Sequence, residues 1–250
     1  MIVIVGNGNM AFSIANGLKD AHKLVVVGRS MAKLDEFEAN LGISIQKELI
    51  DGFDVSDKSV ILCVKPANIA EVSTKLNGRS RVLYSVLAGV SIERLKQNFK
   101  SESVVRAMPN LAASVHRSMT TLCGDEEYKD EAKALFGSIG ETLWLNTQNE
   151  LDIATALAGS GPAFLALVAE ALSDGAVREG LIRRDALALT RGLFSGFAPL
   201  LEETKPSDLK DSVMSPAGTT AAGYATLEQA GVRSAFMEAI SKAYKRAKEL

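Results

Sequence analysis

The chain has 250 residues, of which 47% are hydrophobic and 23% are charged, enough to bury one large core or two modest ones. Its 28 basic and 30 acidic side chains give a formal net charge of −2 and form no basic stripe, so nucleic acid is not an expected partner. The chain opens on a strand pattern, and no apolar run approaches the roughly 18 residues of a membrane helix, so neither secretion nor a membrane span is expected.

Short β-branched runs alternate with helical patterns over the first 110 or so residues. The runs are Ile2–Val5, Leu24–Val27, Val60–Val64, Val82–Val86 and Val104–Ala107. This alternation is typical of a parallel sheet wrapped by helices. Because the runs are apolar without clear alternation, we expect helices on both faces of a doubly wound, Rossmann-type α/β sheet.

Beyond residue 150 the strand patterns stop, and alanine and leucine recur at helical spacing. We therefore predict two domains, a nucleotide-binding Rossmann domain at residues 1–150 and an all-helical domain at residues 151–250. Gly161-Pro162 predicts the start of a helix that runs to about Glu179, because proline suits a first helical turn. Its segment Ala163–Leu172 is apolar nearly all round, which predicts a contact beyond its own domain.

A glycine-rich turn follows the first strand pattern and precedes a helical one. Its residues are Gly6, Asn7, Gly8, Asn9, Met10 and Ala11. In this G-x-G-x-x-A form of the dinucleotide fingerprint, Gly6 permits the tight turn, Gly8 lets the backbone approach a pyrophosphate, and Ala11 lets helix and strand pack closely. The helix N-terminus then faces phosphate charge. The context indicates a nucleotide site, although glycines also occur in purely structural turns.

The second strand pattern ends at Gly28-Arg29-Ser30, where NAD-binding domains place an acidic residue. Without a carboxylate to bind the ribose 2′-hydroxyl, an arginine fork and a hydroxyl suit a 2′-phosphate, through charge-assisted hydrogen bonds. The pattern favours NADP(H) over NAD(H). The alternative is that Arg29 is a solvated loop charge and that Ser30 is the N-cap of the next helix.

Two further loops follow strand patterns at the edge where an open α/β sheet binds its ligand. They are Val64-Lys65-Pro66 and Arg106–Asn110, and we expect them to border the nicotinamide. The alternative is that their prolines only end strands and that Lys65 and Arg106 make surface ion pairs.

Histidines and cysteines are too few and too dispersed to predict a metal site. His22 and His116 have no partner at a recognisable spacing. Cys63 and Cys123 both fall in strand-like runs, as is typical of buried thiols in a reducing cytoplasm. We therefore expect no metal, and we expect a cytoplasmic location.

The segment Ser212–Thr220 stands in front of a helical stretch that runs to about Gln229. Pro216 and Gly218 shape a tight turn, after which successive N–H groups and two threonine hydroxyls point at whatever lies before the helix. A substrate carboxylate would fit there. The alternative is plain helix capping by a serine or threonine, which needs neither a Ser-Pro nor a Thr-Thr pair.

Seven segments, taken in order, resemble the pyrroline-5-carboxylate reductase family over essentially the whole chain. They are Gly6–Ala11, Val64–Pro66, Ala88–Ser91, Arg106–Asn110, Gly159–Ala163, Leu209–Asp211 and Ser215–Thr220. The last two are the most specific, because other two-domain NADP-linked reductases do not share them. The resemblance implies a Rossmann domain followed by a helical domain that forms a homodimer through interlocking helices, with further assembly into rings of dimers in many members.

The resemblance also implies an activity, the NADPH-dependent reduction of 1-pyrroline-5-carboxylate to L-proline. It implies that the substrate carboxylate and ring nitrogen are held by Ser215, Gly218, Thr219 and Thr220. Thr220 takes the family's proton-donating or hydrogen-bonding position, and Arg29 and Ser30 hold the 2′-phosphate.

Two departures from the family pattern are visible in the helical half. Ala217 stands where glycine is usual, and Lys205-Pro206 stands where a His-Pro pair is common. The first is expected to cramp the carboxylate loop, and the second removes any role for a histidine there.

This reaction needs little acid–base apparatus, because a protonated cyclic imine is already electrophilic and the protein mainly positions it and excludes water. Two other functions stay open. A hydroxyacid dehydrogenase of the same architecture would need a lysine base on the first interdomain helix, and Gly159–Leu172 contains no lysine. A non-catalytic NADP-sensing protein would not need the second anion site at Ser215–Thr220.

Overall fold

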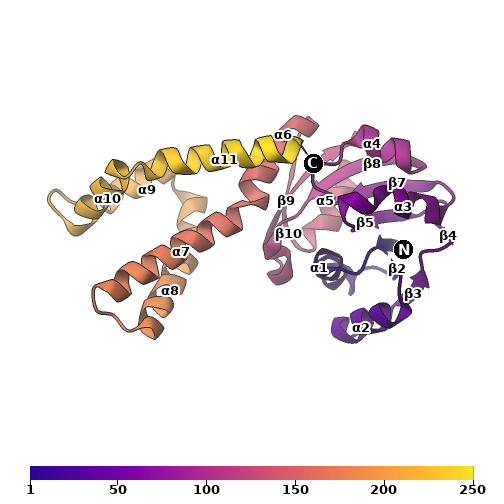
Figure 1. The fold of residues 1–250 in the computed structure, drawn as a ribbon, viewed down its shortest axis with the longest axis horizontal. Helices are drawn as coiled ribbons and strands as arrows, with labels where there is room; N and C mark the ends of the chain where they lie inside the picture. Colours follow the sequence, from indigo (N-terminus) through magenta and orange to yellow (C-terminus); the bar gives the residue numbers. More distant parts are fainter. Residues whose placement is uncertain (250) are drawn as a thin grey trace. The chain divides into compact units, whose positions relative to one another are not determined.

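The computed structural model describes residues 1–249 (Figure 1). Contacts between residues group the chain into two compact units. The first unit runs from Met1 to Pro162 and also includes the residues from Ala243 onward, and the second runs from Ala163 to Lys242. The two units are described in turn.

The first unit is built on an eight-stranded sheet with the order β10-β9-β8-β7-β5-β1-β2-β3. Its strands are β1 (Ile2–Val5), β2 (Leu24–Gly28), β3 (Gln46–Leu49), β5 (Ser59–Leu62), β7 (Ser80–Ser85), β8 (Ser101–Met108), β9 (Ser118–Gly124) and β10 (Gly140–Trp144). A separate two-stranded ladder pairs β4 (Phe53–Asp54) with β6 (Leu76–Asn77). The order on either side of β1 is that of a doubly wound Rossmann-type sheet, as predicted.

The sheet is mixed rather than wholly parallel, because β9 runs antiparallel to β8. The strands predicted over the first 110 or so residues, β1, β2, β5, β7 and β8, do run parallel, and the antiparallel strand lies beyond them. The connection from Met108 to Ser118 holds only a short 3₁₀ helix, Leu111–Val115, and a parallel return needs a crossover of a dozen or more residues. The next connection does contain a full helix, α5, and β10 accordingly runs parallel to β9.

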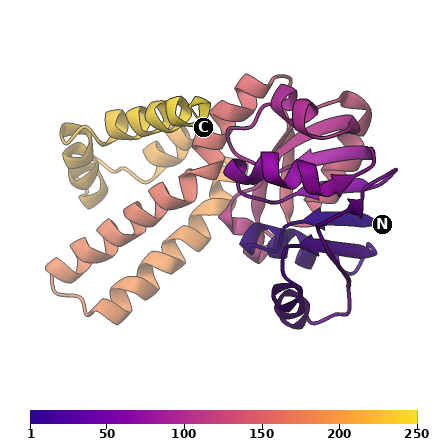
Figure 2. The same ribbon diagram turned by 45° about the vertical axis from the view of Figure 1, so that its right-hand side comes forward.

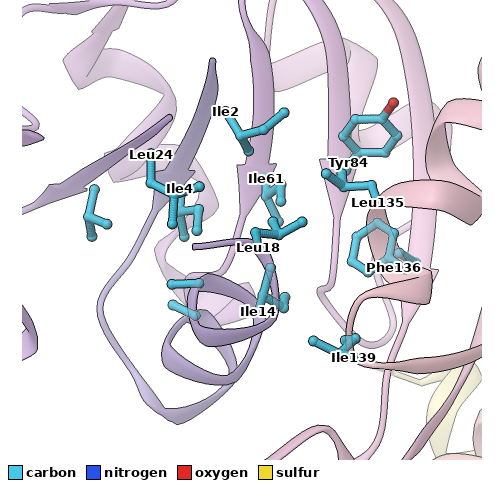
Figure 3. Close-up of a cluster of buried hydrophobic side chains, with 14 of the residues drawn as sticks. Ile2, Ile4, Ile14, Leu18, Leu24, Ile61, Tyr84, Leu135, Phe136 and Ile139 are labelled. Carbon is cyan, nitrogen blue, oxygen red and sulfur yellow. The ribbon is translucent and has the colours of Figure 1, made fainter. Parts of the chain in front are cut away.

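Helices cover both faces of the sheet, as the apolar runs predicted. They are α1 (Asn9–Leu18), α2 (Met31–Leu41), α3 (Ile69–Lys75), α4 (Ile92–Asn98) and α5 (Lys129–Gly137). Alternate strand residues enter opposite cores: Ile2 and Ile4 lie in one cluster with α1, α2 and α5, and Val3 and Val5 lie in the other with α3 and α4. Figure 3 shows the first cluster, in which side chains of α1 and α5 meet those of the strands.

The second unit is all helical within the part of the chain that the structure describes. Its helices are α7 (Gly161–Arg178), α8 (Arg183–Glu203), α9 (Pro206–Ser212), α10 (Thr219–Gln229) and α11 (Val232–Lys248), the first and last of which continue into the first unit. Helices α7 and α8 form a hairpin and lie side by side in both views (Figures 1 and 2). Pro206 occupies the first turn of α9, after Lys205 as N-cap.

Large apolar side chains of α7 and α8 are exposed, including Leu165, Leu167, Leu189 and Leu193, each more than half exposed. The run Gln148–Arg178 is even long and apolar enough to cross a membrane by length and composition, with only 11% of its most apolar window buried. The expectation that no run approaches this length was wrong, because alanines between the larger apolar residues keep the mean hydropathy high and few charged residues interrupt the run. Exposed apolar surface of this size marks a contact with another molecule.

Helix α6 (Gln148–Ala154) precedes this hairpin and packs on the sheet of the first unit. Leu151 of α6 is fully buried against Met108 and Cys123. Tyr244, near the end of α11, donates a hydrogen bond to Asn149 Oδ1 at 2.5 Å. A boundary at residue 150 would divide α6, whereas the contacts place the division after Pro162.

Candidate functional site: a dinucleotide turn and a second anion site

The turn between β1 and α1 has the geometry that a dinucleotide requires. Gly6 has φ +120°, and a Cβ there would lie 2.5 Å from the carbonyl oxygen of Cys63 on the neighbouring strand segment, so only glycine is tolerated. A Cβ on Gly8 would meet nothing within 4 Å, which leaves the approach to the helix open. Ala11 is fully buried.

No side chain caps α1, whose N-cap is Gly8. The N–H groups of its first turn therefore face outward with the positive end of the helix dipole, an arrangement suited to a pyrophosphate. An open hollow of about 780 Å³ lies over this turn. It is lined by residues of the turn and of α1, α2 and the 3₁₀ helix after β8, among them Asn7, Gly8, Asn9, Met10, Lys33 and Leu111.

Arg29 and Ser30 follow β2 directly, next to the dinucleotide turn in the sheet. The Arg29 side chain is largely exposed, and its Nη1 lies 3.7 Å from the carboxylate of Glu71 on α3. Ser30 is the N-cap of α2, but its side chain makes no capping hydrogen bond. An exposed arginine fork and a hydroxyl that makes no capping hydrogen bond therefore stand together where a 2′-phosphate is expected.

Val64, Lys65 and Pro66 follow β5, the neighbour of β1 on its other side. Lys65 is exposed and precedes the short 3₁₀ helix Pro66–Asn68. The three predicted cofactor segments thus lie at the carboxyl ends of the adjacent parallel strands β5, β1 and β2, the edge at which open α/β sheets bind ligands.

Arg106 is not part of a surface ion pair. Its side chain is 2% exposed, and its Nη2 donates to Asp152 Oδ1 of α6 at 2.8 Å. Gln148, also on α6, accepts from Arg106 Nη1 at 3.5 Å and from the backbone N–H of Ile92 at 2.7 Å. The alternative weighed for Arg106 was therefore wrong: this arginine joins β8 to α6 inside the first unit. Arg106 Nε is buried without a partner.

Asn110 connects the loop after β8 to a π-helical turn, Thr155–Gly159, between α6 and α7. Its Nδ2 donates to the carbonyl oxygen of Ala158 at 2.9 Å, and its Oδ1 accepts from the N–H of Ala112 at 3.1 Å. Pro162, four residues after Ala158, has no N–H to donate to that carbonyl. Turns of the π-helical kind occur often at functional sites. No periodicity in the sequence signalled it.

The histidines and cysteines have structural places. His116 contacts the side chain of Asn16 and the carbonyl oxygen of Ser138, at 3.1 Å and 3.3 Å. Burial raises the thiol pKa of both Cys63 and Cys123. Among residues 1–249 no group of three potential metal ligands is found.

The segment before α10 brings the predicted substrate residues together in the second unit. Gly218 is the N-cap of α10, no side chain caps this helix, and Thr219 and Thr220 form its first turn. A Cβ on Gly218 would lie 2.3 Å from Ser215 Oγ and 3.1 Å from the Ser215 carbonyl oxygen, so a larger residue would displace the Ser215 hydroxyl from this turn. The Gly218 N–H donates to the Ser215 carbonyl at 3.0 Å.

Ala217 has φ +58°, in the left-handed region that favours glycine. This is the position where the family pattern has glycine, and an alanine there costs on the order of 1–2 kcal/mol. Alanine at this position therefore strains the backbone of the loop before α10.

The two groups of residues indicate a class before any relative is considered. A Rossmann sheet with the dinucleotide fingerprint, followed by a helical unit in which a helix N-terminus has no side-chain cap, is typical of a two-domain NAD(P)-dependent oxidoreductase. Residues 1–89 match the family model described as NADP oxidoreductase coenzyme F420-dependent. Residues 148–250 match the model described as pyrroline-5-carboxylate reductase dimerisation.

Curated and solved relatives narrow this class. The chain is 36% identical to the pyrroline-5-carboxylate reductase of a Synechocystis strain, over 99% of this chain and 97% of that protein. It is 35% identical to that of Pisum sativum, over 98% and 94%. The solved 1-pyrroline-5-carboxylate reductase of Streptococcus pyogenes is 32% identical, with a TM-score of 0.88 over 100% and 98% of the two chains. This chain belongs to the pyrroline-5-carboxylate reductase family.

A more distant solved structure shares the fold. The pyrroline carboxylate reductase of Plasmodium falciparum, solved with NADP bound, is 24% identical, with a TM-score of 0.80 over 99% of this chain and 97% of that one.

Proposed function

We propose that this chain reduces 1-pyrroline-5-carboxylate to L-proline, by hydride transfer from NADPH to the ring C=N bond. The observation that supports the proposal is that one chain holds two helix N-termini without a side-chain cap, one after the glycine-rich turn Gly6–Ala11 and one in the turn Ser215–Thr220. Relatives that match this chain from end to end carry the name of that activity.

The first unit would hold the cofactor, which supplies the hydride when bound. The residues of the turn, Gly6, Asn7, Gly8, Asn9, Met10 and Ala11, fit a pyrophosphate because the first N–H groups of α1 are open to it. Arg29 and Ser30 would hold the 2′-phosphate. Val64, Lys65 and Pro66 would border the nicotinamide end.

The second unit would hold the imine. Backbone N–H groups of Thr219 and Thr220, with the Ser215 and Thr219 hydroxyls, would bind its carboxylate. Gly218, whose own N–H donates to the Ser215 carbonyl, would shape the turn. The Thr220 hydroxyl would hydrogen-bond to the ring nitrogen and supply or relay its proton. These side chains position the imine and need provide no strong acid or base, since the protonated imine is already electrophilic.

The quaternary structure proposed is a homodimer formed by the helical unit, assembled further into a ring of dimers, in the cytoplasm. The dimerisation match at residues 148–250 and the exposed leucines of α7 and α8 support the dimer. Two cysteines without a disulfide suit a reducing compartment.

The test is loss of NADPH absorbance on addition of 1-pyrroline-5-carboxylate, with proline identified as the product. Reactions without imine, with NADH in place of NADPH, and with a 2-keto acid in place of the imine serve as controls. Turnover of the keto acid alone would instead indicate a hydroxyacid dehydrogenase. NADPH binding without any turnover would indicate a sensor.

A further inference from the structure

The segment Leu209–Asp211 is specific to the family resemblance but has no role in the site described so far. Lys210 lies in the last turn of α9, and its Nζ sits over the ring of Tyr224 on α10, 5.1 Å from the ring centroid. Lys210 also pairs with the adjacent Asp211 carboxylate. This hydrogen bond raises the pKa of Lys210 above its usual value, so the residue stays cationic.

Tyr224 is joined to the next helix as well. Arg233, in the first turn of α11, donates from Nη2 to the Tyr224 hydroxyl at 2.7 Å. That hydroxyl donates in turn to the carboxylate of Glu228, which also accepts from Arg233 Nε at 3.3 Å. Tyr224 thus contacts Lys210 of α9 through its ring and Arg233 of α11 through its hydroxyl.

Tyr224 lies on the same helix as Thr220, so contacts that fix Tyr224 also affect the proposed substrate site. Tyr224 lies four residues after Thr220, and residues at this spacing share a face of a helix. The loop 213–218 connects α9 to α10 and contains the strained Ala217. Its own backbone bonds are few: the Met214 N–H donates to Asp211 and the Gly218 N–H to Ser215.

We propose that Tyr224, through Lys210, is a positioning residue that holds α9 and α10 together across the loop 213–218 and so keeps Ser215, Gly218 and Thr220 in register for the imine carboxylate. The inference rests on the proposed function. Tyr224 and Lys210 act through the backbone of the loop and do not touch the substrate. Arg233 and Glu228, which also pair with each other, hold the hydroxyl end of Tyr224.

Three substitutions in the full chain separate the parts of this arrangement. Lys210→Met keeps the length of the side chain and removes the charge, Tyr224→Leu removes the ring, and Tyr224→Phe keeps the ring and removes the hydroxyl. Lys242→Met is the matched control, since Lys242 is an exposed lysine of α11. Each variant is checked for its oligomeric state and its helix content by circular dichroism.

An exposed cation–π contact predicts an effect of about two- to fivefold. We expect Lys210→Met and Tyr224→Leu each to raise KM for the imine by this factor, with kcat and the Kd of NADPH within twofold of the wild type. Tyr224→Phe, which keeps the ring, should have a KM for the imine close to that of the wild type. The double variant Lys210→Met/Tyr224→Leu should be no worse than the worse single one, because both remove the same contact.

Hydrogen exchange of the backbone in residues 213–218 tests the same inference without substrate. We expect faster exchange there in Lys210→Met and Tyr224→Leu, and unchanged exchange in Lys242→Met. Unchanged KM and exchange, fully additive effects in the double variant, or an equal loss of NADPH affinity would overturn the proposal. A wild-type protein that reduces no imine would contradict the proposed function alone. The exchange measurement would still test whether the contact between Lys210 and Tyr224 holds the loop 213–218.

Discussion

The preference for NADPH that we propose rests on two side chains after β2, those of Arg29 and Ser30. Arg29→Asp removes charge-assisted hydrogen bonds worth about 1.5–3 kcal/mol and adds repulsion toward the 2′-phosphate. We expect the Kd of NADPH to rise by roughly 10- to 150-fold, and the Kd of NADH to stay equal or fall. Titration of cofactor fluorescence measures both, with Arg79→Asp, at an exposed arginine elsewhere in the first unit, as control. Equal losses for both cofactors would remove Arg29 from the 2′-phosphate site.

A substitution at Thr220 tests the proposed supply of the proton separately from the binding of the carboxylate. Thr220→Val keeps the size of the side chain and deletes the hydroxyl, while the backbone N–H groups of α10 stay in place. If the hydroxyl serves the ring nitrogen in the transition state, kcat and kcat/KM should fall together by roughly 10²–10⁴-fold, with little change in KM.

The control for this variant is Thr226→Val on the same helix, where the hydroxyl donates to the Ala222 carbonyl at 3.2 Å. Steady-state kinetics at saturating NADPH compare the two. Full kcat in Thr220→Val at every pH would mean that the proton comes from solvent.

At the scale of single residues, the dinucleotide turn was predictable because its chemistry is local: Gly6 and Gly8 sit in a short stretch whose backbone geometry the fingerprint encodes. The contacts of Arg106 and Asn110 could not be predicted. Their partners, Asp152 and the Ala158 carbonyl, lie 46 and 48 residues away along the chain. Only the fold brings such pairs together.

Besides its buried apolar side chains, α5 has one carboxylate that is hydrogen-bonded to the sheet. Glu131 accepts from Arg81 Nη1 at 2.9 Å, from the hydroxyl of the buried Tyr84 at 2.9 Å and from Ser59 Oγ at 3.2 Å. Burial raises the pKa of Glu131, but the hydrogen bonds, chiefly from Arg81, outweigh it, so the pKa lies below the ordinary 4.5. The stabilisation is therefore present above pH 4.5 and is lost as the pH falls through the lowered pKa of the folded state.

The corresponding prediction concerns Glu131→Gln. At neutral pH this variant should lose about 1 kcal/mol of unfolding free energy, since a partly exposed charged network is replaced by neutral hydrogen bonds. In acid the difference from the wild type should shrink. Urea unfolding from pH 7 downward measures it, with Glu141→Gln on the exposed side of β10 as control. A difference that grows in acid would contradict the assignment.

Central strands of the sheet were predictable and its edges were not. β1, β2, β5, β7 and β8 are buried on both faces and read as apolar runs, whereas β3, Gln46–Leu49, is partly exposed and polar. An edge strand pairs on one side only, so its sequence need not be apolar. The run at Met119–Cys123 was recognised as strand-like, but its antiparallel direction depends on the short connection before it.

For the whole molecule, the exposed leucines of α7 and α8 predict how subunits associate. Leu167 is 63% exposed, and burying it in a dimer would stabilise association by about 1.5–3 kcal/mol. Leu167→Glu forfeits this and places an unpaired charge in the contact. We expect the wild type to sediment as a dimer at micromolar concentration and the variant as a monomer.

Leu49→Glu is the matched control for Leu167→Glu, because Leu49 is an exposed leucine of the first unit. It should sediment like the wild type. A full-length wild type that is monomeric under these conditions would refute the dimer, whatever the variants do.

The order of the two domains could be predicted from the change in pattern near residue 150, and the start of α7 from Gly161-Pro162. It could not be predicted that the residues from Ala243 onward belong to the first unit. Amphipathic spacing shows that α11 has an apolar face, but not that its last turns lie against the first unit.

This return of the last residues to the first unit sets an order of events during synthesis. The contact between Tyr244 and Asn149, and the burial of Ala247, complete the first unit with residues that leave the ribosome only after the entire helical unit has emerged. The nucleotide-binding sheet can form early, yet α6 acquires its last neighbour at the end of translation. A nascent chain stalled before Ala243 would therefore carry a sheet ready for cofactor but still lacking its final support.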